Sequence, residues 1–318
     1  MARTRLNDVL PACCRSDVDL APMTYCKIGG VARVLCIAES EADLVEAIEY
    51  RKASALAVED VFVLGGGANV LINDAHDFGL VLKLSQRFNA IRYDETTQTA
   101  RIEAGIYTPR LVREAAKRGW DGFQFLAGVP GSLGGAIVMN AGIRELSTWK
   151  LVIEIEGIDW NGERRTLTRE DLKPGYRKGN VPADVIVTAA TCTVHVGDPD
   201  TMHATARTLS SSRRETQPLQ FPSWGSTFMN PSGASSTGRT AGALVDAAGL
   251  KGYRVGDAQI SEVHANFIVN RGNATAADAL ECIRHAYQVV RDQFEIRLEL
   301  EVRLVGFAPS DLAFLENR

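Results

Sequence analysis

The sequence predicts an α+β fold built from three successive parts. A strand, a helix and a second strand occupy residues 31–63 and end in a run of glycines. Short strands and an Asn-Gly hairpin signal dominate from residue 88 onward. Two prolines and a glycine between residues 218 and 225 then mark the start of a last part, in which helices alternate with strands.

The first part carries strong local signals. VARVLCIA at 31–38 has the composition of a strand, and Ser40 with Asp43 forms a capping box before the helical pattern of Leu44 and Ile48. VFVLGGG, which begins at residue 61, predicts a strand that ends in a turn where the backbone can approach a ligand closely. LVLKL, from residue 80, predicts a further buried strand.

The middle part mixes strands with one helix and one glycine-rich segment. FNAIRYD and TARIEAG predict short strands, and a helix is expected to begin at Thr108 with Pro109 in its first turn. Residues 126–142 hold five glycines, too many for the interior of a helix or strand, so we expect a shaped loop. VIEIEGIDW, Asn161-Gly162 and RRTLT predict a hairpin, and DVIVTAATCTVHV predicts another strand.

The last part follows a helical pattern at 200–214 and the boundary sequence SRRETQPLQFPSWGS. GALVDAAG predicts a helix closed by Gly249, and NFIVN, ADALECIRHAYQVVRDQF and IRLELEVRLVG predict a strand, a long helix and a strand. These patterns divide the chain into an N-terminal extension at 1–19 and parts at 20–85, 86–207 and 208–318.

Composition and charge limit the classes of function. Hydrophobic residues make up 45% of the chain and charged residues 23%, as in an ordinary globular protein. The formal net charge of −4 argues against a general binder of nucleic acid or of membrane surfaces, since such binders need a basic face. The chain shows no secretory signal pattern and no run of apolar residues long enough for a membrane span, so a cytoplasmic location is the default expectation.

The cysteines do not show the spacing of a metal site. Six of them stand at positions 13, 14, 26, 36, 192 and 282, without a CxxC pair or a nearby Cys/His pattern that tetrahedral zinc needs. Cys13 and Cys14 are adjacent and too close to bridge each other without strain. We therefore expect reduced thiols, no disulfide framework and no bound metal.

The run Gly65, Gly66, Gly67, Ala68 and Asn69 follows a predicted strand. Successive small residues let backbone N–H groups converge on a phosphate, which suits the pyrophosphate of a dinucleotide. A plain tight turn explains the same run equally well. The run is not the Rossmann fingerprint, because the third glycine is missing and VLINDAHDFG does not have a helical pattern.

A second glycine-rich segment is more specific, because its glycines are dense and its flanks are apolar. It runs from Gly128 through Pro130, Gly131, Ser132, Gly134 and Gly135 to Asn140. A flat aromatic ring could lie against such a backbone. The structural alternative is a buried crossover in which the glycines only relieve crowding.

Several ordered motifs together resemble one family. They are TYCKIGGVA, VLGGGANVLIND, AGVPGSLGGAIVMNAG, GYR, QPLQFPSWGSTFMNP, AGLKG, SEVHANFIVN and LELEVRLVG, and they extend over nearly the whole chain past residue 20. In this order they resemble the UDP-N-acetylenolpyruvoylglucosamine reductases. The short distance from Arg177 to Ser226 and the HAN motif are similar to the family's second type, which lacks an inserted tyrosine loop.

The resemblance implies a fold, cofactors and a pathway. The fold is a two-lobed FAD-binding domain of the vanillyl-alcohol-oxidase type followed by a smaller α+β substrate-binding domain. FAD is expected without a covalent bond, held by the two glycine segments, and NADPH is expected as the hydride donor. The substrate is a small nucleotide sugar on the route to peptidoglycan, on which cell shape and division depend. The oligomeric state stays open.

The motifs also imply three catalytic residues. Arg177 in GYR can donate a planar fork to the substrate carboxylate, where negative charge builds during reduction. Ser226 in WGSTF matches the family's proton donor, and Glu301 in LELEVR matches its acidic partner. Without the motifs these residues would be a surface arginine, a loop serine and a solvent-facing carboxylate of an alternating strand.

The resemblance also implies residues that contact the substrate, and the sequence departs from the family pattern at some positions. Asn230 and Lys251, with Tyr176 and Arg214 as weaker candidates, are expected to contact the diphosphate and sugar. His264 and Asn266 match the family in either a structural or a substrate-binding role. Three positions depart from the family pattern and put nucleotide contacts in doubt: Gly179 for serine, Thr216 for lysine and Met229 for lysine.

Three other functions compete with this interpretation. An alcohol or sugar-lactone oxidase on the same scaffold is disfavoured by the third domain, and those oxidases often tether FAD through a histidine, which the glycine motifs lack. A binding protein without turnover is disfavoured by the retained Arg177, Ser226 and Glu301. A serine acyl-enzyme suggested by Ser147 and Lys150 is disfavoured because neither SDN nor KTG follows.

Overall fold

The computed structural model describes residues 9–143, 146–231 and 238–315 of the chain. Contacts divide these residues into two compact units, each made of discontinuous segments. Unit 1 takes its described residues from Met1–Val18, Ala32–Gly66 and Phe78–Arg213, and unit 2 takes its own from Asp19–Val31, Gly67–Asp77 and Arg214–Arg318. The four-part division predicted from the sequence is a different one, and its boundaries stay a prediction.

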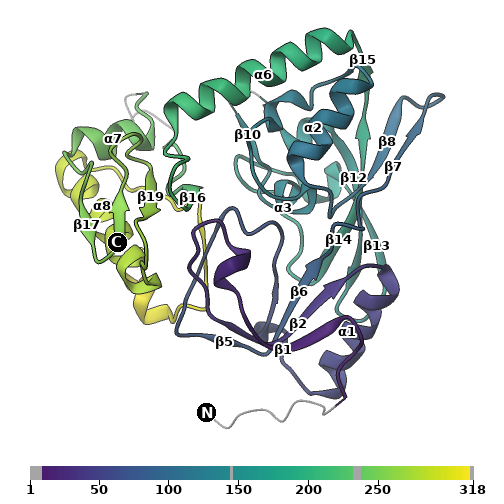
Figure 1. Cartoon of the computed structure of the whole chain (residues 1–318), viewed down its shortest axis with the longest axis horizontal. Helices are drawn as coiled ribbons and strands as arrows, with labels where there is room; N and C mark the ends of the chain where they lie inside the picture. The colour runs from purple at the N-terminus through teal and green to yellow at the C-terminus, as the bar shows by residue number, and fades with distance from the viewer. Residues whose placement is uncertain (1–8, 144–145, 232–237, 316–318) are drawn as a thin grey trace. The chain divides into compact units, whose positions relative to one another are not determined.

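The first sheet of unit 1 contains the strands of the predicted strand–helix–strand segment (Figure 1). Its strand order is β1-β2-β6-β3, with β5 paired to β2, and both β2 and β3 run parallel to β6. The bounds are β1 (Cys14–Asp19), β2 (Val31–Ala38), β3 (Val61–Val63), β5 (Asp77–Phe78) and β6 (Leu80–Leu84).

Helix α1 (Glu41–Ala53) packs on this sheet. Residues close together in the sequence determine where the helix begins and which of its faces is buried. Ser40 accepts a hydrogen bond from the Asp43 N–H while the Asp43 carboxylate accepts from the Ser40 N–H, which is the predicted capping box. Leu44 and Ile48 of the helix pack in one core with buried residues of β2 and β6. The predicted strand, helix and further strand are confirmed here.

The second sheet of unit 1 is antiparallel throughout, in the order β13-β12-β14-β8-β7. The predicted hairpin is confirmed, since β12 and β13 pair from Glu154 with Thr168 to Ile158 with Arg164. The turn uses Gly162 at φ +85°, where glycine carries no steric cost. The bounds are β7 (Ile91–Asp94), β8 (Thr99–Glu103), β12 (Val152–Asp159), β13 (Arg164–Thr168) and β14 (Val185–Thr193).

Further α-helices and two short strand pairs follow among the described residues up to 216. Helix α2 begins at Thr108 with Pro109 in its first turn, as predicted. The helices are α2 (Thr108–Lys117), α3 (Leu133–Val138), α4 (Thr148–Leu151), α5 (Arg169–Leu172) and α6 (Pro199–Thr216). The strand pairs are β9 (Trp120–Asp121) with β15 (His195–Val196), and β10 (Gly142–Ile143) with β11 (Leu146–Ser147).

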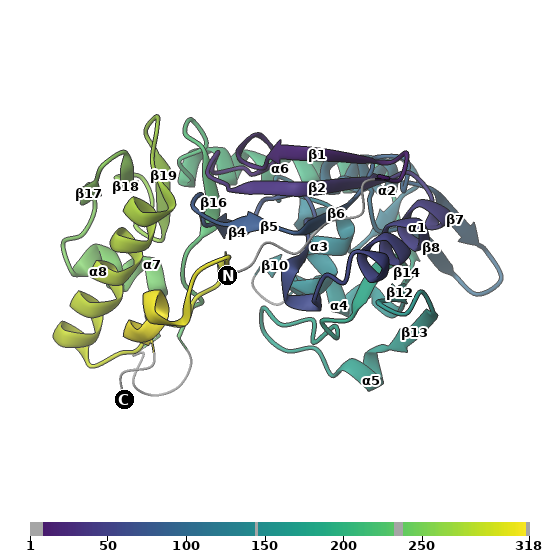
Figure 2. The ribbon, with the colours of Figure 1, turned by 90° about the horizontal axis from the view of Figure 1, so that it is seen from below.

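Unit 2 is built on an antiparallel sheet in the order β16-β19-β18-β17 (Figure 2). Helix α8 packs on β17 and β18, and α7 packs against α8. A separate parallel pair joins β4 (Val70–Ile72) to β20 (Arg303–Val305). The other bounds are β16 (Ser223–Ser226), α7 (Ala241–Ala247), β17 (Arg254–Val255), β18 (Ala258–Ile260), β19 (Phe267–Asn270) and α8 (Ala276–Phe294).

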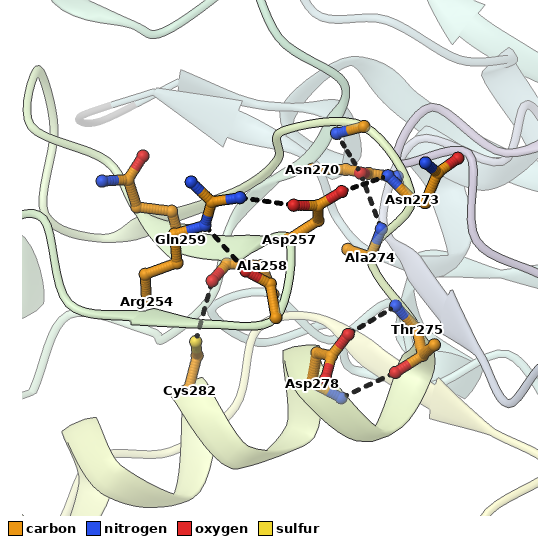
Figure 3. Close-up of polar contacts among 12 residues, drawn as sticks. Arg254, Asp257, Ala258, Gln259, Asn270, Asn273, Ala274, Thr275, Asp278 and Cys282 are labelled. Carbon is orange, nitrogen blue, oxygen red and sulfur yellow. Dashed lines mark hydrogen bonds and ion pairs between the residues drawn. The ribbon is translucent and has the colours of Figure 1, made fainter.

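The connection from β19 to α8 is fixed by side chains that satisfy backbone N–H groups (Figure 3). The Asn270 Oδ1 accepts from the N–H groups of Gly272 and Ala274 at 2.9 and 3.0 Å. Thr275 and Asp278 then form a capping box at the start of α8. The apolar face of α8 follows at once, and its residues Leu280 and Ile283 lie in the core of unit 2.

Two predicted elements are wrong in part. Residues 126–142 are not all loop, because α3 forms within them: Ser132 caps its start, and Gly134 lies close to Ala104, so the tight packing favours glycine inside the helix. The predicted strand IRLELEVRLVG is regular only over β20. The preceding residues make single hydrogen bonds to the segment after β16 instead of a continuous ladder. Among the helices of the described residues, none is long and apolar enough to span a membrane.

Candidate functional site

The two predicted glycine segments meet inside unit 1. A Cβ atom built on Gly66 would lie 2.3 Å from the Cα of Gly131, and one built on Gly65 would lie 3.3 Å from the Ser132 Oγ. No side chain could be placed at Gly66 without moving the backbone of the second segment. The structure therefore brings together the two segments that the sequence assigned to one cofactor.

The second glycine segment is held by the connection between β8 and α2. Thr108 donates its N–H to the Gly131 carbonyl at 3.1 Å and its hydroxyl to the Val129 carbonyl at 2.5 Å. Leu133 and Gly134 donate their N–H groups to the carbonyls of Ile106 and Ala104 at 3.0 and 2.8 Å. Ser132 then accepts from the Gly135 N–H. These bonds fix the path of the backbone, which a binding loop needs if it is to be preorganised.

Gly134 and Gly135 of the second segment differ in how much space surrounds them. At Gly134 an added Cβ would press on Ala104 at 3.3 Å, so packing explains that glycine. At Gly135 the nearest atom is the Ser132 Oγ at 3.7 Å, and nothing else lies within 4 Å. An added Cβ at Gly135 would therefore make only an ordinary contact, so crowding does not explain this glycine, and a flat ring or a phosphate could lie against its backbone. The residues present fit a bound dinucleotide.

Lys83 is a candidate that sequence reasoning missed. It lies in β6 and donates from Nζ to the Gly65 carbonyl, at the start of the first glycine segment. Burial lowers the pKa of Lys83 to about 8. A buried ammonium group beside this segment would be stabilised by the negative charge of a phosphate. The signal was a lysine inside the otherwise apolar strand LVLKL.

The rest of the first glycine run belongs to unit 2. Gly67 has φ +69°, and an added Cβ would lie 2.2 Å from the Met23 carbonyl oxygen. Its own carbonyl accepts from the Tyr25 N–H at 2.9 Å. Asn69 donates from Nδ2 to the main-chain carbonyl of Glu301 at 2.9 Å. The end of the glycine run is thereby linked to the segment that carries a predicted catalytic residue.

Ser226 and Glu301 lie on neighbouring backbone segments of unit 2. Ser226 is the last residue of β16, and the N–H of Glu301 donates to the carbonyl of the next residue, Thr227, at 2.9 Å. Met229 donates its N–H to the Glu299 carbonyl at 2.8 Å on the same pair of segments. Glu301 precedes β20 and is not part of a regular strand, so the alternation that would place it in solvent does not apply.

Asn266 fixes the segment that follows Ser226. Its Oδ1 accepts from the Phe228 N–H at 2.9 Å and its Nδ2 donates to the Phe228 carbonyl at 2.8 Å, while its own carbonyl accepts from the Thr227 N–H at 2.7 Å. Asn266 is buried. The Trp224 Nε1 donates to the Thr227 Oγ1 at 3.2 Å. These contacts give Asn266 a structural part in holding the turn beside Ser226.

His264 lies next to this network and is half-buried. Its Nδ1 accepts from the Asn266 N–H at 3.2 Å, and a Cβ built on Gly242 would lie 2.9 Å from its Cε1. Burial lowers the pKa of His264 below its usual value, and the nearby charge of Lys251 acts in the same direction. The imidazole is thus favoured in its neutral form, which matches its role as a hydrogen-bond acceptor.

Arg177 lies in unit 1, in a segment held by the second glycine loop. Its φ is +56°, a left-handed conformation that residues other than glycine rarely adopt. Asn140 at the end of that loop donates from Nδ2 to the Gly175 carbonyl at 2.7 Å. The Arg177 guanidinium lies 5.0 Å from the centroid of the Tyr176 ring. Such backbone strain is typical of positions with a functional constraint.

A second arginine of unit 1 lies near Arg177 and was also missed. Burial lowers the pKa of Arg213 below its usual value, and the positive charge of Arg177 lowers it further. The Arg213 side chain approaches Gly128, whose added Cβ would lie 3.0 Å from the Arg213 Cδ. Two guanidinium groups that repel each other would both be stabilised by an anion. Its neighbour Arg214, a weaker substrate candidate from the sequence, is exposed.

The predicted substrate residues of unit 2 already make contacts of their own. The Asn230 Oδ1 accepts from the Ala241 N–H at 3.0 Å, at the start of α7. Lys251 forms an ion pair with Asp246 at 2.8 Å. Both side chains are exposed. Among the candidates of unit 1, Tyr176 is 52% exposed, so its ring is accessible to a ligand.

The departure at Gly179 has a physical explanation. A Cβ at this position would lie 2.1 Å from the Ile137 carbonyl oxygen, and the Gly179 N–H donates to the Val138 carbonyl at 2.9 Å. The family's serine would not fit against α3 on this backbone. The glycine follows from how closely the Arg177 segment packs on the second glycine loop. Nothing in the structure explains Thr216 or Met229.

Comparisons with known proteins identify two domains in the chain. Residues 32–168 match an FAD binding domain, and residues 217–305 match the C-terminal domain of UDP-N-acetylenolpyruvoylglucosamine reductase. The fold is therefore an FAD-binding domain of mixed helix and strand content followed by that C-terminal domain.

Individual relatives and one solved structure cover nearly the whole chain. UDP-N-acetylenolpyruvoylglucosamine reductase of Anaeromyxobacter sp. strain K is 41% identical over 304 residues, which is 95% of this chain and 88% of the relative. The enzyme of that name from Trichormus variabilis is 38% identical over 295 residues, 92% of this chain and 86% of the relative.

The crystal structure of UDP-N-acetylenolpyruvylglucosamine reductase from Thermus caldophilus gives the same result for the fold. It superposes with a TM-score of 0.77 at 34% identity and covers 92% of this chain and 99% of that one. At this identity and coverage, the likeness extends through both domains. The chain belongs to the UDP-N-acetylenolpyruvoylglucosamine reductase family.

Proposed function

We propose that this chain reduces UDP-N-acetylenolpyruvoylglucosamine to UDP-N-acetylmuramate in peptidoglycan synthesis, with NADPH as the hydride donor and FAD as the cofactor. The observation that carries the proposal is the presence, in one chain, of the FAD binding domain and of the C-terminal domain particular to these reductases. Relatives that carry the reductase name match over more than nine-tenths of the chain.

FAD is held without a covalent bond in this proposal. The assigned residues are Gly65, Gly66, Gly67, Ala68, Asn69, Gly128, Pro130, Gly131, Ser132, Gly134, Gly135 and Asn140. The contact between Gly66 and Gly131 and the absence of crowding at Gly135 support the assignment. Lys83 joins the set, because its ammonium group lies at the Gly65 carbonyl. Bound FAD would supply hydride transfer from NADPH to the β carbon of the enol ether.

Side chains of the protein then stabilise the charge and donate the proton at the substrate. Arg177 holds the carboxylate with its planar guanidinium and stabilises the negative charge that builds on the α carbon and the carboxylate. Arg213 adds positive charge beside it. The Ser226 hydroxyl donates a proton to the α carbon. Because a serine is a weak acid, the step relies on a strongly basic acceptor and on polarising partners, of which Glu301 is one.

Substrate recognition and setting complete the proposal. Tyr176, Arg214, Asn230 and Lys251 contact the nucleotide diphosphate and the sugar. The enzyme is of the family's second type, without the inserted tyrosine loop, and it works in the cytoplasm. Its partner is this small nucleotide sugar and neither nucleic acid nor a membrane. The chain is divided into four parts at 1–19, 20–85, 86–207 and 208–318, and the last part is the substrate-binding domain.

A direct assay tests the proposal. Purified protein is mixed with NADPH and the enolpyruvyl nucleotide, and the loss of NADPH absorbance is followed together with chromatography of the nucleotide product. The proposal predicts one UDP-N-acetylmuramate for each NADPH consumed. NADPH loss that is independent of the nucleotide, or rapid oxygen consumption with a simple alcohol, would instead indicate an oxidase.

A further inference from the structure

Three cysteine thiols come together in unit 1, outside the glycine segments and outside the catalytic set. The Sγ atom of Cys13 lies 3.2 Å from that of Cys36 and 3.9 Å from that of Cys14. All three sulfur atoms lie within 4.8 Å of one another. They are thiols and not a disulfide, whose sulfur atoms would lie about 2.05 Å apart.

The fold produces this cluster by pairing strands, which is why sequence spacing gave no sign of it. Cys14 opens β1, Cys36 lies within β2, and the two strands are neighbours in the first sheet. The Cys13 carbonyl accepts from the Ile37 N–H at 3.0 Å, which fixes Cys13 beside β2. Strand pairing therefore brings Cys36 to the adjacent pair Cys13 and Cys14.

The cluster has the spacing of ligands around a small cation. Zinc–sulfur bonds of about 2.3 Å in a tetrahedron place the sulfur atoms about 3.8 Å apart. The Cys13 sulfur lies 3.2 and 3.9 Å from the other two, and no pair is more than 4.8 Å apart, so the three sulfur atoms lie near the tetrahedral spacing. Three thiolates are soft ligands, and they select Zn²⁺ or a cation of similar preference over Mg²⁺ or Ca²⁺.

Two carboxylates lie beside Cys13, at one edge of the thiol cluster. Cys13, Asp43 and Glu46 form a second group whose ligand atoms lie within 4.8 Å of one another. The Asp43 carboxylate already accepts from the N–H groups of Glu39 and Ser40 at the start of α1. Glu46, one turn further along the helix, is exposed and is the better candidate.

We propose that Cys13, Cys14 and Cys36 form a three-thiolate site for a thiophilic divalent cation, represented by Zn²⁺, and that the Glu46 carboxylate moves in from beside Cys13 to become the fourth ligand. The site would join the start of β1 to β2 and to α1. Its role is structural, because none of its residues belongs to the proposed cofactor or substrate set. Binding replaces thiol protons by the metal ion, so proton release accompanies it and affinity rises with pH.

The test uses the full-length, FAD-containing protein, reduced and treated with chelator, and Zn²⁺ as the probe. Competition with a colorimetric chelator should give about one tight equivalent per chain, and zinc X-ray absorption should show three sulfur neighbours at about 2.3 Å. Cys13→Ser should weaken binding by at least about 100-fold, more than the loss of an outer-shell partner does. Zn²⁺ should also raise the melting temperature of the parent protein.

Matched variants separate the site from a general effect of losing a thiol. Cys36 and Cys282 are both fully buried, but only Cys36 belongs to the cluster. Cys36→Ser should lose tight Zn²⁺ binding and Cys282→Ser should keep it. Cys13 is partly exposed, so Cys13→Ser keeps the test decisive if the buried variants fold poorly. NADPH-dependent turnover should be unchanged in Cys13→Ser at a temperature where both proteins are folded.

Two results would overturn the proposal. The first is Zn²⁺ affinity in Cys13→Ser equal to that of the parent protein. The second is a reduced parent protein that binds no Zn²⁺ but reacts with glutathione disulfide, giving a Cys13–Cys36 disulfide and two glutathione thiols. That outcome would make the cluster a redox-active pair of thiols.

Discussion

Asn69 donates a hydrogen bond from Nδ2 to the main-chain carbonyl of Glu301 at 2.9 Å, across 232 positions of sequence. The N–H of Glu301 in turn donates to Thr227, the residue after Ser226. Within unit 2, the Asn69 side chain thus holds the backbone of Glu301, and that backbone in turn holds the residue next to the proposed proton donor. The position of Glu301 depends on a residue that was chosen from the sequence as a cofactor ligand.

Asn69→Ala should therefore disturb the Glu301 segment. Loss of the hydrogen bond should lower the free energy of unfolding by about 1 kcal/mol, and the transfer of reducing equivalents to the enolpyruvyl nucleotide should slow. Urea unfolding and single-turnover kinetics check the two effects. Asn161→Ala, at an exposed hairpin turn, is the matched control and should change neither. If Asn69→Ala behaved like this control, the bond would have no part in positioning Glu301.

The glycine segments predict a yellow protein with noncovalent FAD. Acid precipitation should release the colour into the supernatant, because nothing in the proposed set tethers the flavin. Mass spectrometry of the supernatant identifies the flavin. Protein that is colourless and takes up no FAD on reconstitution would contradict the assignment. FMN in the supernatant would leave the run at Gly65 without a pyrophosphate to bind.

Lys83 predicts a specific dependence of stability on pH. Its pKa is about 8 in the folded chain and 10.5 in an unfolded reference, so between these values the unfolded chain binds more protons at this position. Stability therefore rises with pH through that window, by up to about 1.4 kcal/mol per pH unit. Chemical unfolding of the FAD-free chain should show this rise in the parent and lose it in Lys83→Met.

The control for this prediction is Lys117→Met, since Lys117 is exposed on α2. Its pH dependence should match that of the parent protein. If the stability of the parent protein and of Lys83→Met rose equally with pH, burial would not lower the pKa of Lys83.

Arg177→Lys and Glu301→Gln should impair the reduction of the enolpyruvyl nucleotide while the fold and the FAD content persist. Lysine keeps the charge of Arg177 but loses the bidentate fork, and glutamine keeps the shape of Glu301 but loses its charge. Steady-state turnover, with circular dichroism and flavin absorbance as checks of folding, measures the effect. Parental turnover in both variants would place the carboxylate-binding site elsewhere.

Local signals made several elements predictable from the sequence. The capping box of Ser40 and Asp43 and the turn at Gly162 each depend on residues close together in the chain, so the sequence alone located α1 and the hairpin. Contacts between distant segments were not predictable in this way. Helix α3 contains Gly134 because Ala104 approaches it closely, and that approach comes from tertiary packing.

The residues of the candidate site also differ in whether the sequence or only the structure identified them. Family motifs selected Arg177, Ser226 and Glu301, although their isolated residue types and positions favoured ordinary surface roles. Lys83 carried only a weak signal, a lysine in an apolar strand, and Arg213 carried none, so the burial and contacts of both residues were needed to single them out. The thiol cluster likewise required the pairing of β1 with β2.

Ser226→Ala should separate the two half-reactions, because proton donation to the α carbon belongs only to the half-reaction with the nucleotide. Stopped-flow absorbance follows flavin reduction by NADPH and flavin reoxidation by the enolpyruvyl nucleotide in separate experiments. We expect near-parental reduction and reoxidation slower by about 10²-fold to 10⁴-fold, the usual contribution of a positioned acid. Ser226→Cys should restore part of the rate, since a thiol can also donate a proton. An alanine variant that is slow in flavin reduction but parental in reoxidation would show that Ser226 is not the proton donor.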